Sequence, residues 1–125
     1  MNVWIGVILG GAVGSALRYA VSLFMGSKLG PEFPYGTLTV NVTGCLLIGL
    51  LGVMLVGPWW GREEVRLAIL VGCLGGFTTF SSFGADALGL IEQGRWTAAM
   101  VYVSVTNIAG LIAVWAGDRI GRTLG

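Results

Sequence analysis

The sequence predicts an all-α integral membrane protein that crosses the lipid bilayer four times. Hydrophobic residues make up 55% of the 125 positions, only 10% are charged, and the mean hydropathy is +0.86. A soluble domain of this length needs more charge to cover its surface. Because a hydrocarbon core of about 30 Å takes roughly 20 apolar residues per helical span, four spans use nearly the whole chain. We therefore expect a single membrane domain over residues 1–125.

Four apolar stretches are separated by polar or Gly/Pro-rich breaks. They cover about residues 3–25, 36–56, 67–91 and 97–116, and the second ends at Gly57-Pro58. All three prolines lie between the spans, where they interrupt helices at little cost. The five tryptophans lie near span ends, the usual place of an aromatic belt. They are Trp4, Trp59, Trp60, Trp96 and Trp115.

Glycines in the first and third spans are spaced for close helix contact. Gly6, Gly10 and Gly14 recur every four residues in the first span, and Gly72 and Gly76 do so in the third. In lipid there is little hydrophobic attraction between helices, so close backbone approach supplies much of the stabilisation. These stripes predict a compact bundle or an oligomer, and alone they indicate no function.

Basic residues divide almost equally between the two predicted sides of the membrane. Arg62, Arg66, Arg119 and Arg122 lie on the side of the termini, and Arg18, Lys28 and Arg95 lie on the other. Such a small bias fixes the orientation only weakly. Two interpretations stay open: copies insert both ways and pair antiparallel, or so few charges carry no information about orientation.

The third span contains a run that is unusual for a membrane helix. Residues 72–84 (GCLGGFTTFSSFG) combine paired glycines, four hydroxyl residues and three aromatic rings. Because Gly and Thr are unfavourable in a helix interior, we expect this helix to break near residues 75–79. Freed carbonyls at that depth would suit a hard cation, which takes oxygen ligands. A kink held by Ser and Thr hydroxyls is the alternative.

Polar and aromatic side chains at membrane depth indicate a second kind of site. Asn41 in the second span needs hydrogen-bond partners, and an interhelical bond is the simplest explanation for one such residue. Phe80 and Phe83 share a helical face, where packing is their ordinary role, but ring edges can also face a small anion. With Asn41, Ser81 and Ser82 as uncharged donors, the set suits an anion that must bind weakly enough to leave.

Several function classes are disfavoured. The sequence has no histidine, its net charge is only +1, nothing resembles a nucleotide site, and the spans offer no nucleophile–base pair of an enzyme. A small multidrug-type transporter would need a membrane-embedded carboxylate, and only Asp86, near a span end, comes close. A scaffold that assembles through its glycine stripes would leave Asn41, Phe80 and Phe83 without a purpose.

Three runs of sequence carry a resemblance to a known family. Residues 10–19 (GGAVGSALRY), 36–44 (GTLTVNVTG) and 75–83 (GGFTTFSSF) are similar to its first-, second- and third-span motifs. The runs occur in the family's order over nearly the full chain, and jointly they are highly specific. On these residues, the sequence resembles the Fluc (CrcB) family of fluoride ion channels.

The resemblance implies a passive, fluoride-selective channel in the bacterial inner (plasma) membrane. It implies an antiparallel, dual-topology homodimer surrounded by membrane lipid, with two pores and one structural sodium ion (Na⁺) at its centre. Because nothing in the sequence resembles a nucleotide site and the net charge is only +1, we expect no nucleotide or nucleic-acid partner.

The resemblance also assigns residues. The sodium ligands would be the backbone carbonyls of Gly75 and Thr78. The fluoride pore would comprise Asn41, Phe80, Phe83, Ser81, Ser82 and Arg18, the last as a basic residue near a vestibule. Asp86 stands where the family usually has Glu, and Ser82 replaces a common Thr. Asn107 in the fourth span would also face a pore, although it matches the family less closely than the other residues do.

Overall fold

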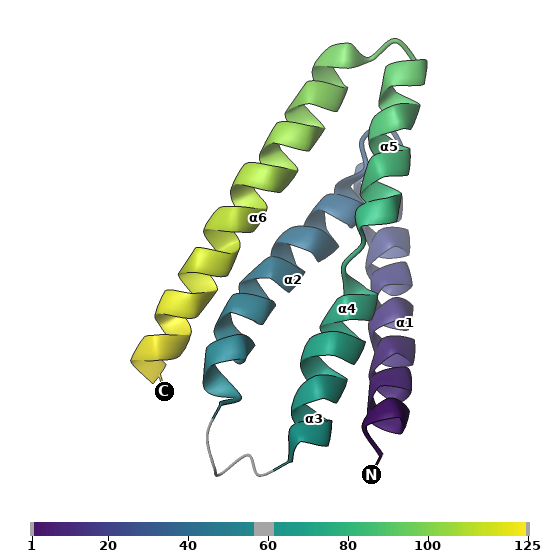
Figure 1. Cartoon of the computed structure of the whole chain (residues 1–125). Helices are drawn as coiled ribbons and strands as arrows, with labels where there is room; N and C mark the ends of the chain where they lie inside the picture. The colour runs from purple at the N-terminus through teal and green to yellow at the C-terminus, as the bar shows by residue number, and fades with distance from the viewer. Residues whose placement is uncertain (1, 57–61, 125) are drawn as a thin grey trace.

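The computed structural model describes residues 2–56 and 62–124, and all regular secondary structure in these residues is helical. The helices are α1 (Val3–Leu29), α2 (Tyr35–Met54), α3 (Glu63–Leu67), the π-helical η1 (Ala68–Cys73), α4 (Leu74–Phe77), α5 (Phe80–Glu92) and α6 (Trp96–Leu124) (Figure 1). Four segments are long and apolar enough to cross a membrane: residues 3–29, 35–54, 63–92 and 96–124. The predicted all-α fold with four spans is therefore confirmed. The break expected at Gly57-Pro58, and Trp59 and Trp60, lie outside the described residues.

Helix α1 runs the length of the bundle without interruption. At about 1.5 Å per residue, its 27 residues reach about 40 Å, which exceeds the hydrocarbon thickness. The Asn2 side chain caps its start by accepting a hydrogen bond from the Trp4 backbone N–H at 2.7 Å. Gly30 ends it with a φ of 84°, a conformation that glycine adopts without strain.

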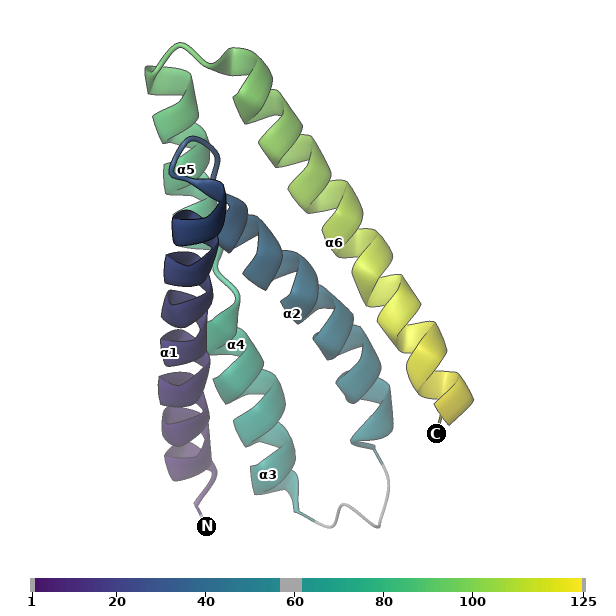
Figure 2. The same cartoon turned by 180° about the vertical axis from the view of Figure 1, so that it is seen from behind.

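The bundle is built from two closely packed helix pairs, which glycine makes possible. One pair is α1 with the series α3–η1–α4, and the other is α2 with α6 (Figures 1 and 2). A Cβ atom on Gly10 would overlap the carbonyl oxygen of Ala68, and one on Gly72 would lie 2.7 Å from the carbonyl oxygen of Val7. A Cβ atom on Gly49 would likewise overlap the carbonyl oxygen of Val114. The predicted glycine stripes of the first and third spans therefore face each other.

The third membrane segment is a bent series of joined helices. Helix α4 ends at Phe77, Thr78 (ψ 159°) and Thr79 (φ −154°) have extended backbone, and α5 begins at Phe80. The two extended residues fall inside the 75–79 region that the sequence singles out. The Thr79 hydroxyl caps α5 by accepting a hydrogen bond from the Ser82 N–H at 3.1 Å. The π-helical turn η1 beside Gly10 has no counterpart in the sequence-based expectations.

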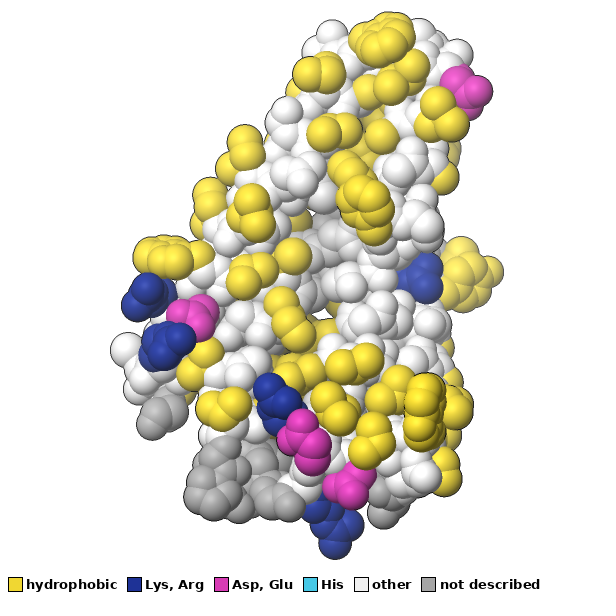
Figure 3. Space-filling model, viewed as in Figure 1, with side chains coloured by type: hydrophobic (Ala, Val, Ile, Leu, Met, Phe, Trp, Pro, Cys, Tyr) yellow, Lys and Arg dark blue, Asp and Glu magenta, His cyan; other side chains and the backbone are white. Residues whose placement is uncertain are grey.

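Most large apolar side chains lie on the outer faces of the bundle, and few of them are buried in a closed core. The buried cluster is small, and Phe83, Leu90, Ala99 and Tyr102 form it between α5 and α6. Large apolar side chains elsewhere on α1 and α6 are exposed. Figure 3 shows apolar side chains over much of one face, with most charged side chains toward the end that carries the termini. Such a surface is stable only against lipid or another apolar partner.

Candidate functional site

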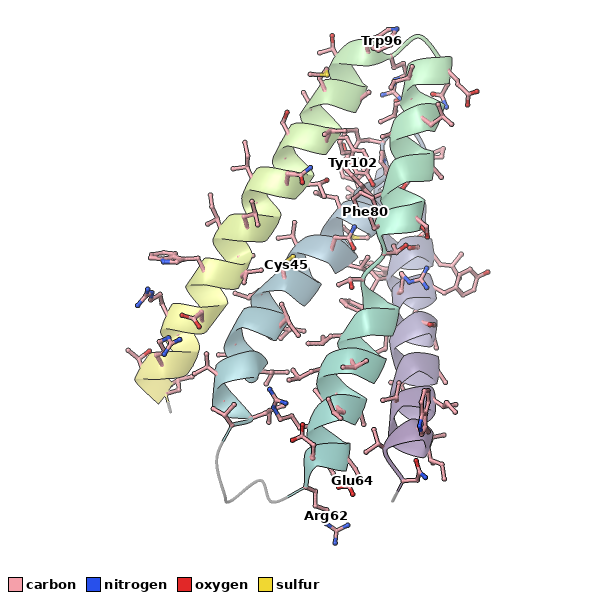
Figure 4. All side chains as sticks on the ribbon, viewed as in Figure 1. Cys45, Arg62, Glu64, Phe80, Trp96 and Tyr102 are labelled. Atoms are coloured by element: carbon pink, nitrogen blue, oxygen red, sulfur yellow. The ribbon has the colours of Figure 1, made fainter. Side chains whose placement is uncertain are left out.

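A cavity of about 440 Å³ lies among α2, the α4–α5 link and α6. Five of the predicted site residues line it: Asn41, Gly75, Thr78, Phe80 and Phe83. Figure 4 labels Cys45 on α2 and Phe80 on α5, which both border this cavity. None of the lining residues in the described part of the chain is charged, and most are apolar residues or glycine. The wall can therefore offer backbone and amide groups to a small ion but no fixed countercharge.

The two phenylalanines differ in their exposure. Phe80 is 82% exposed, whereas Phe83 is only 8% exposed. Their ring centroids lie 5.6 Å apart, and Phe83 in turn lies 5.2 Å from the ring of Tyr102, both in tilted arrangements. The Phe83 ring is held in place by its packing against Tyr102, whereas the Phe80 ring is exposed and can present its edge to a neighbouring group.

Asn41 pairs with the backbone of the third segment. Its Nδ2 donates to the carbonyl oxygen of Thr79 at 3.0 Å, and its Oδ1 accepts from the Thr79 N–H at 2.8 Å. Both polar groups of one extended residue are thus satisfied by one amide, as membrane depth requires. The interhelical bond expected for Asn41 is present. Since the amide has two N–H groups and this pairing uses one, a second donor remains for the cavity.

The extended link also frees carbonyl groups. In a continuous helix, the carbonyl of Gly75 would accept from the Thr79 N–H, and that of Thr78 from the Ser82 N–H. Here the Thr79 N–H donates to Asn41, and the Ser82 N–H donates to the Thr79 hydroxyl. The carbonyls of Gly75 and Thr78 therefore lose their helical donors, and both residues line the cavity.

The remaining predicted residues lie off the cavity wall. Arg18 on α1 donates through Nε to the carbonyl oxygen of Gly76 at 2.9 Å. The Ser81 hydroxyl lies 3.3 Å from that of Thr79, and the Ser82 N–H donates to the same Thr79 hydroxyl. The Tyr102 hydroxyl donates to the Asp86 carboxylate at 3.2 Å, which gives Asp86 a partner.

Comparison with known families matches residues 5–118 to the family described as "CrcB-like protein, Camphor Resistance (CrcB)". The chain belongs to the CrcB family. The match begins inside the first span, ends inside the fourth and covers the two spans between them, so the predicted membership is confirmed over nearly the whole sequence.

Curated relatives of this CrcB chain are similar along almost their full lengths. A protein from Chloroflexus aurantiacus, named fluoride-specific ion channel FluC, is 42% identical over 125 residues, which cover 100% of this chain and 99% of its own. Proteins of the same name from Rhizobium etli and Rhizobium meliloti are each 43% identical, over 118 residues (94% of both chains) and 115 residues (92% of both). The relatives are bacterial ion channels, so this CrcB chain is a multi-pass membrane protein and not an enzyme.

Sequence reasoning named Asn107 on the fourth span but missed its neighbours Thr106 and Gly110 in the cavity wall. Thr106 on α6 lines the cavity, and its buried Oγ1 has no hydrogen-bond partner in the described structure. Asn107 also lines it, although its Nδ2 donates to the carbonyl oxygen of Val103 in its own helix at 2.8 Å. Gly110 lies one helical turn further along the same side. The spacing of these small and polar residues, three or four positions apart in the fourth span, was the sequence signal that they share one side of the helix.

Proposed function

We propose that this CrcB chain forms a passive, fluoride-selective channel. The observation that carries the proposal is one uncharged cavity that brings together Asn41, Phe80 and Phe83, in a chain whose relatives are named fluoride-specific channels. Amide N–H donors and ring edges can replace part of the water around a small anion. Because the wall carries no fixed positive charge, the anion is not held too tightly to leave.

The direction of transport follows from acid–base chemistry and the membrane potential. Hydrogen fluoride is a weak acid that crosses membranes uncharged and dissociates in a neutral cytoplasm, which traps the anion inside. A channel lets the anion leave down its gradient, and an inside-negative potential assists its exit. Export therefore needs no nucleotide. Ser81 and Ser82 lie next to Phe80 at the start of α5 and extend the uncharged donors along the route.

The working unit of the channel is an antiparallel dimer with two pores. Phe80 is 82% exposed in the single chain, and a second copy packed against its ring would supply the van der Waals contacts that stabilise helix association in lipid. The nearly balanced basic residues of the two sides permit insertion in both orientations. Each copy then contributes Asn41 and its phenylalanines, so two equivalent routes result.

One sodium ion lies at the centre of this dimer. The carbonyls of Gly75 and Thr78, which lose their helical donors at the extended link, would hold it from each copy. Uncharged carbonyl oxygens fit a hard monovalent cation, and the positive charge would fix the two interrupted segments against each other. No cluster of three His, Cys, Asp or Glu residues occurs in the described residues, so a carboxylate or thiolate centre is not an alternative there.

Fluoride efflux from loaded liposomes tests the channel directly. Purified protein in vesicles loaded with potassium fluoride should release fluoride to an external electrode once valinomycin balances the charge. Vesicles loaded with potassium chloride should release little chloride under the same conditions. Absence of fluoride release from protein that is folded and inserted would refute the proposed function.

Sodium exchange tests the central ion. Preparation with N-methylglucamine in place of sodium should lower both the fluoride flux and the melting temperature, and added sodium should restore both. If neither property changes after sodium is removed, the sodium site is refuted while the channel itself stands.

A further inference from the structure

Arg18 is a charged residue well inside α1, at a depth where an unpaired charge is costly. It is half-buried and does not line the cavity. Its Nε donates to the backbone carbonyl of Gly76, 58 positions further along the chain, at 2.9 Å. A charged donor on a carbonyl makes a stronger hydrogen bond than a neutral donor does.

A glycine stripe on α1 brings Arg18 to this carbonyl. Gly10, Gly14 and Arg18 follow one another at intervals of four, so they share one face of the helix. A Cβ atom on Gly14 would overlap the Cys73 carbonyl oxygen and would lie 2.9 Å from the Phe77 nitrogen. With the two backbones in contact there, the side chain one turn further on reaches the end of α4.

The Gly76 carbonyl needs a donor because the helix is interrupted. In a continuous helix it would accept from the N–H of Phe80. Phe80 instead starts α5 after two extended residues, so the helical bond is lost. Arg18 supplies the replacement from α1, while Asn41 pairs with Thr79 from α2. The link is therefore held by side chains from two different helices.

We propose that Arg18 is a positioning residue of the channel: its Nε–H fixes the Gly76 carbonyl toward α1 and thereby holds the extended link in place beside the cavity. The adjacent Gly75 and Thr78 then keep their place on the cavity wall. This role differs from the attraction of anions by a basic vestibule residue. It rests on the proposed channel function only because fluoride flux is one of the two readouts.

Three substitutions separate the donor from the charge. In Arg18→Gln, the amide nitrogen occupies the chain position of Nε, so the donor remains and the charge is removed. Arg18→Met has similar length with neither donor nor charge. Arg18→Lys keeps the charge but moves the nitrogen one bond further along the chain. Each variant is reconstituted at equal amounts of folded protein, and fluoride efflux is measured against fluoride concentration together with the melting temperature.

The proposal expects Arg18→Gln to keep maximal flux within about threefold of the unsubstituted protein, and Arg18→Met to lose about tenfold or more, as for loss of one charge-assisted bond. Arg18→Lys should resemble Arg18→Met in maximal flux. A charge role would instead leave Arg18→Lys active and raise the half-saturating fluoride concentration of Arg18→Gln at low ionic strength.

Three outcomes overturn the proposal. The maximal flux of Arg18→Gln does not exceed that of Arg18→Met, the maximal flux of Arg18→Lys exceeds that of Arg18→Gln, or all three variants have the maximal flux of the unsubstituted protein. If Arg18→Met does not fold, the comparison moves to folded yield and melting temperature, where Arg18→Gln must exceed both other variants. If the unsubstituted protein releases no fluoride, the proposed function fails, and the same melting comparison still decides the role of Arg18.

Discussion

Asn41 illustrates at the scale of one residue why an amide suits the third segment. The extended Thr79 presents one N–H and one carbonyl to α2, and a carboxamide is the side chain that both donates and accepts at one point. An aspartate could accept the hydrogen bond from the Thr79 N–H, but its carboxylate would repel the Thr79 carbonyl oxygen. A threonine side chain is shorter than that of asparagine and would not reach both groups. The residue that borders the cavity thus also completes the backbone hydrogen bonding.

Replacement of this amide has a predictable cost. Asn41→Ala leaves the N–H and the carbonyl of Thr79 unpaired, which should destabilise the protein by roughly 2–4 kcal/mol and lower flux. Asn107→Ala is the matched control, because Asn107 also borders the cavity but bonds only within its own helix. Thermal unfolding in detergent and fluoride efflux measure the two effects. Equal stability losses in the two variants would contradict the assigned role of Asn41.

The exposed ring of Phe80 gives a second prediction for a single residue. Phe80→Ile keeps apolar bulk but removes the ring edge, so fluoride flux should fall roughly fivefold while the dimer persists, since aromatic edge interactions are worth about 1 kcal/mol. Phe24→Ile on α1, at 59% exposure and away from the cavity, should leave flux unchanged. Efflux assays measure the flux, and size-exclusion chromatography measures whether the dimer persists. Unchanged flux in Phe80→Ile would show that the Phe80 ring is not part of the fluoride pathway.

At the scale of secondary structure elements, helix contacts depend on the absence of side chains. The pairs of α1 with the third segment and of α2 with α6 bring carbonyl oxygens to within reach of glycine Cα atoms. Lipid offers no hydrophobic reward for helix association, so this close fit provides the attraction. It also places α1 near enough for Arg18 to reach Gly76.

The same substitution at two glycines should have opposite effects. Gly14→Ala would place a Cβ atom on the Cys73 carbonyl and should destabilise the protein by about 1–3 kcal/mol. Gly52→Ala meets no atom within 4 Å and should be neutral or stabilise α2 by up to about 1 kcal/mol. Melting temperatures of the two variants in one detergent provide the measurement. A stable Gly14→Ala variant would show that α1 can move away from the third segment.

At the scale of the whole molecule, the single chain leaves a large apolar surface uncovered. Phe80 and large apolar side chains of α1 and α6 are exposed, and lipid or a second copy must cover them. Arg62 precedes α3 at the end that carries the termini, and Gln93 follows α5 at the opposite end (Figure 1). In an antiparallel pair, these two positions of different copies come to the same side of the membrane.

Cross-linking in the membrane distinguishes the two arrangements. In a cysteine-free background, copies with Arg62→Cys are co-expressed with copies carrying Gln93→Cys and treated with a bifunctional thiol reagent. We expect the reagent to join a copy with Arg62→Cys to a copy with Gln93→Cys, because these two positions lie on the same side of the membrane in an antiparallel pair. Two copies with the same substitution should not be joined, because their cysteines lie on opposite sides. Each variant expressed alone serves as the control. Recovery of like pairs only would refute dual topology.

Much of the candidate site was readable from the sequence because its residues lie in short runs. Phe80 and Phe83 share a helical face at fixed spacing, and the glycines and hydroxyl residues before them weaken the helix locally. Thr106 was not identified, since a single threonine in an apolar span does not show which neighbour it faces, and only its spacing with Asn107 and Gly110 pointed to a shared side of the helix. The function of Arg18 was also beyond a sequence reading, because a basic residue in a motif suggests charge before it suggests a hydrogen bond.

The sequence by itself determined the four crossings and the glycine faces, since hydropathy and residue spacing act along a single stretch of chain. Only the tertiary structure decided which groups pair. Asn41 meets Thr79 across 38 positions and Arg18 meets Gly76 across 58, and those partners depend on how helices pack side by side. The physical reason is that a polar group in the membrane must find a partner, while the sequence states only that it needs one.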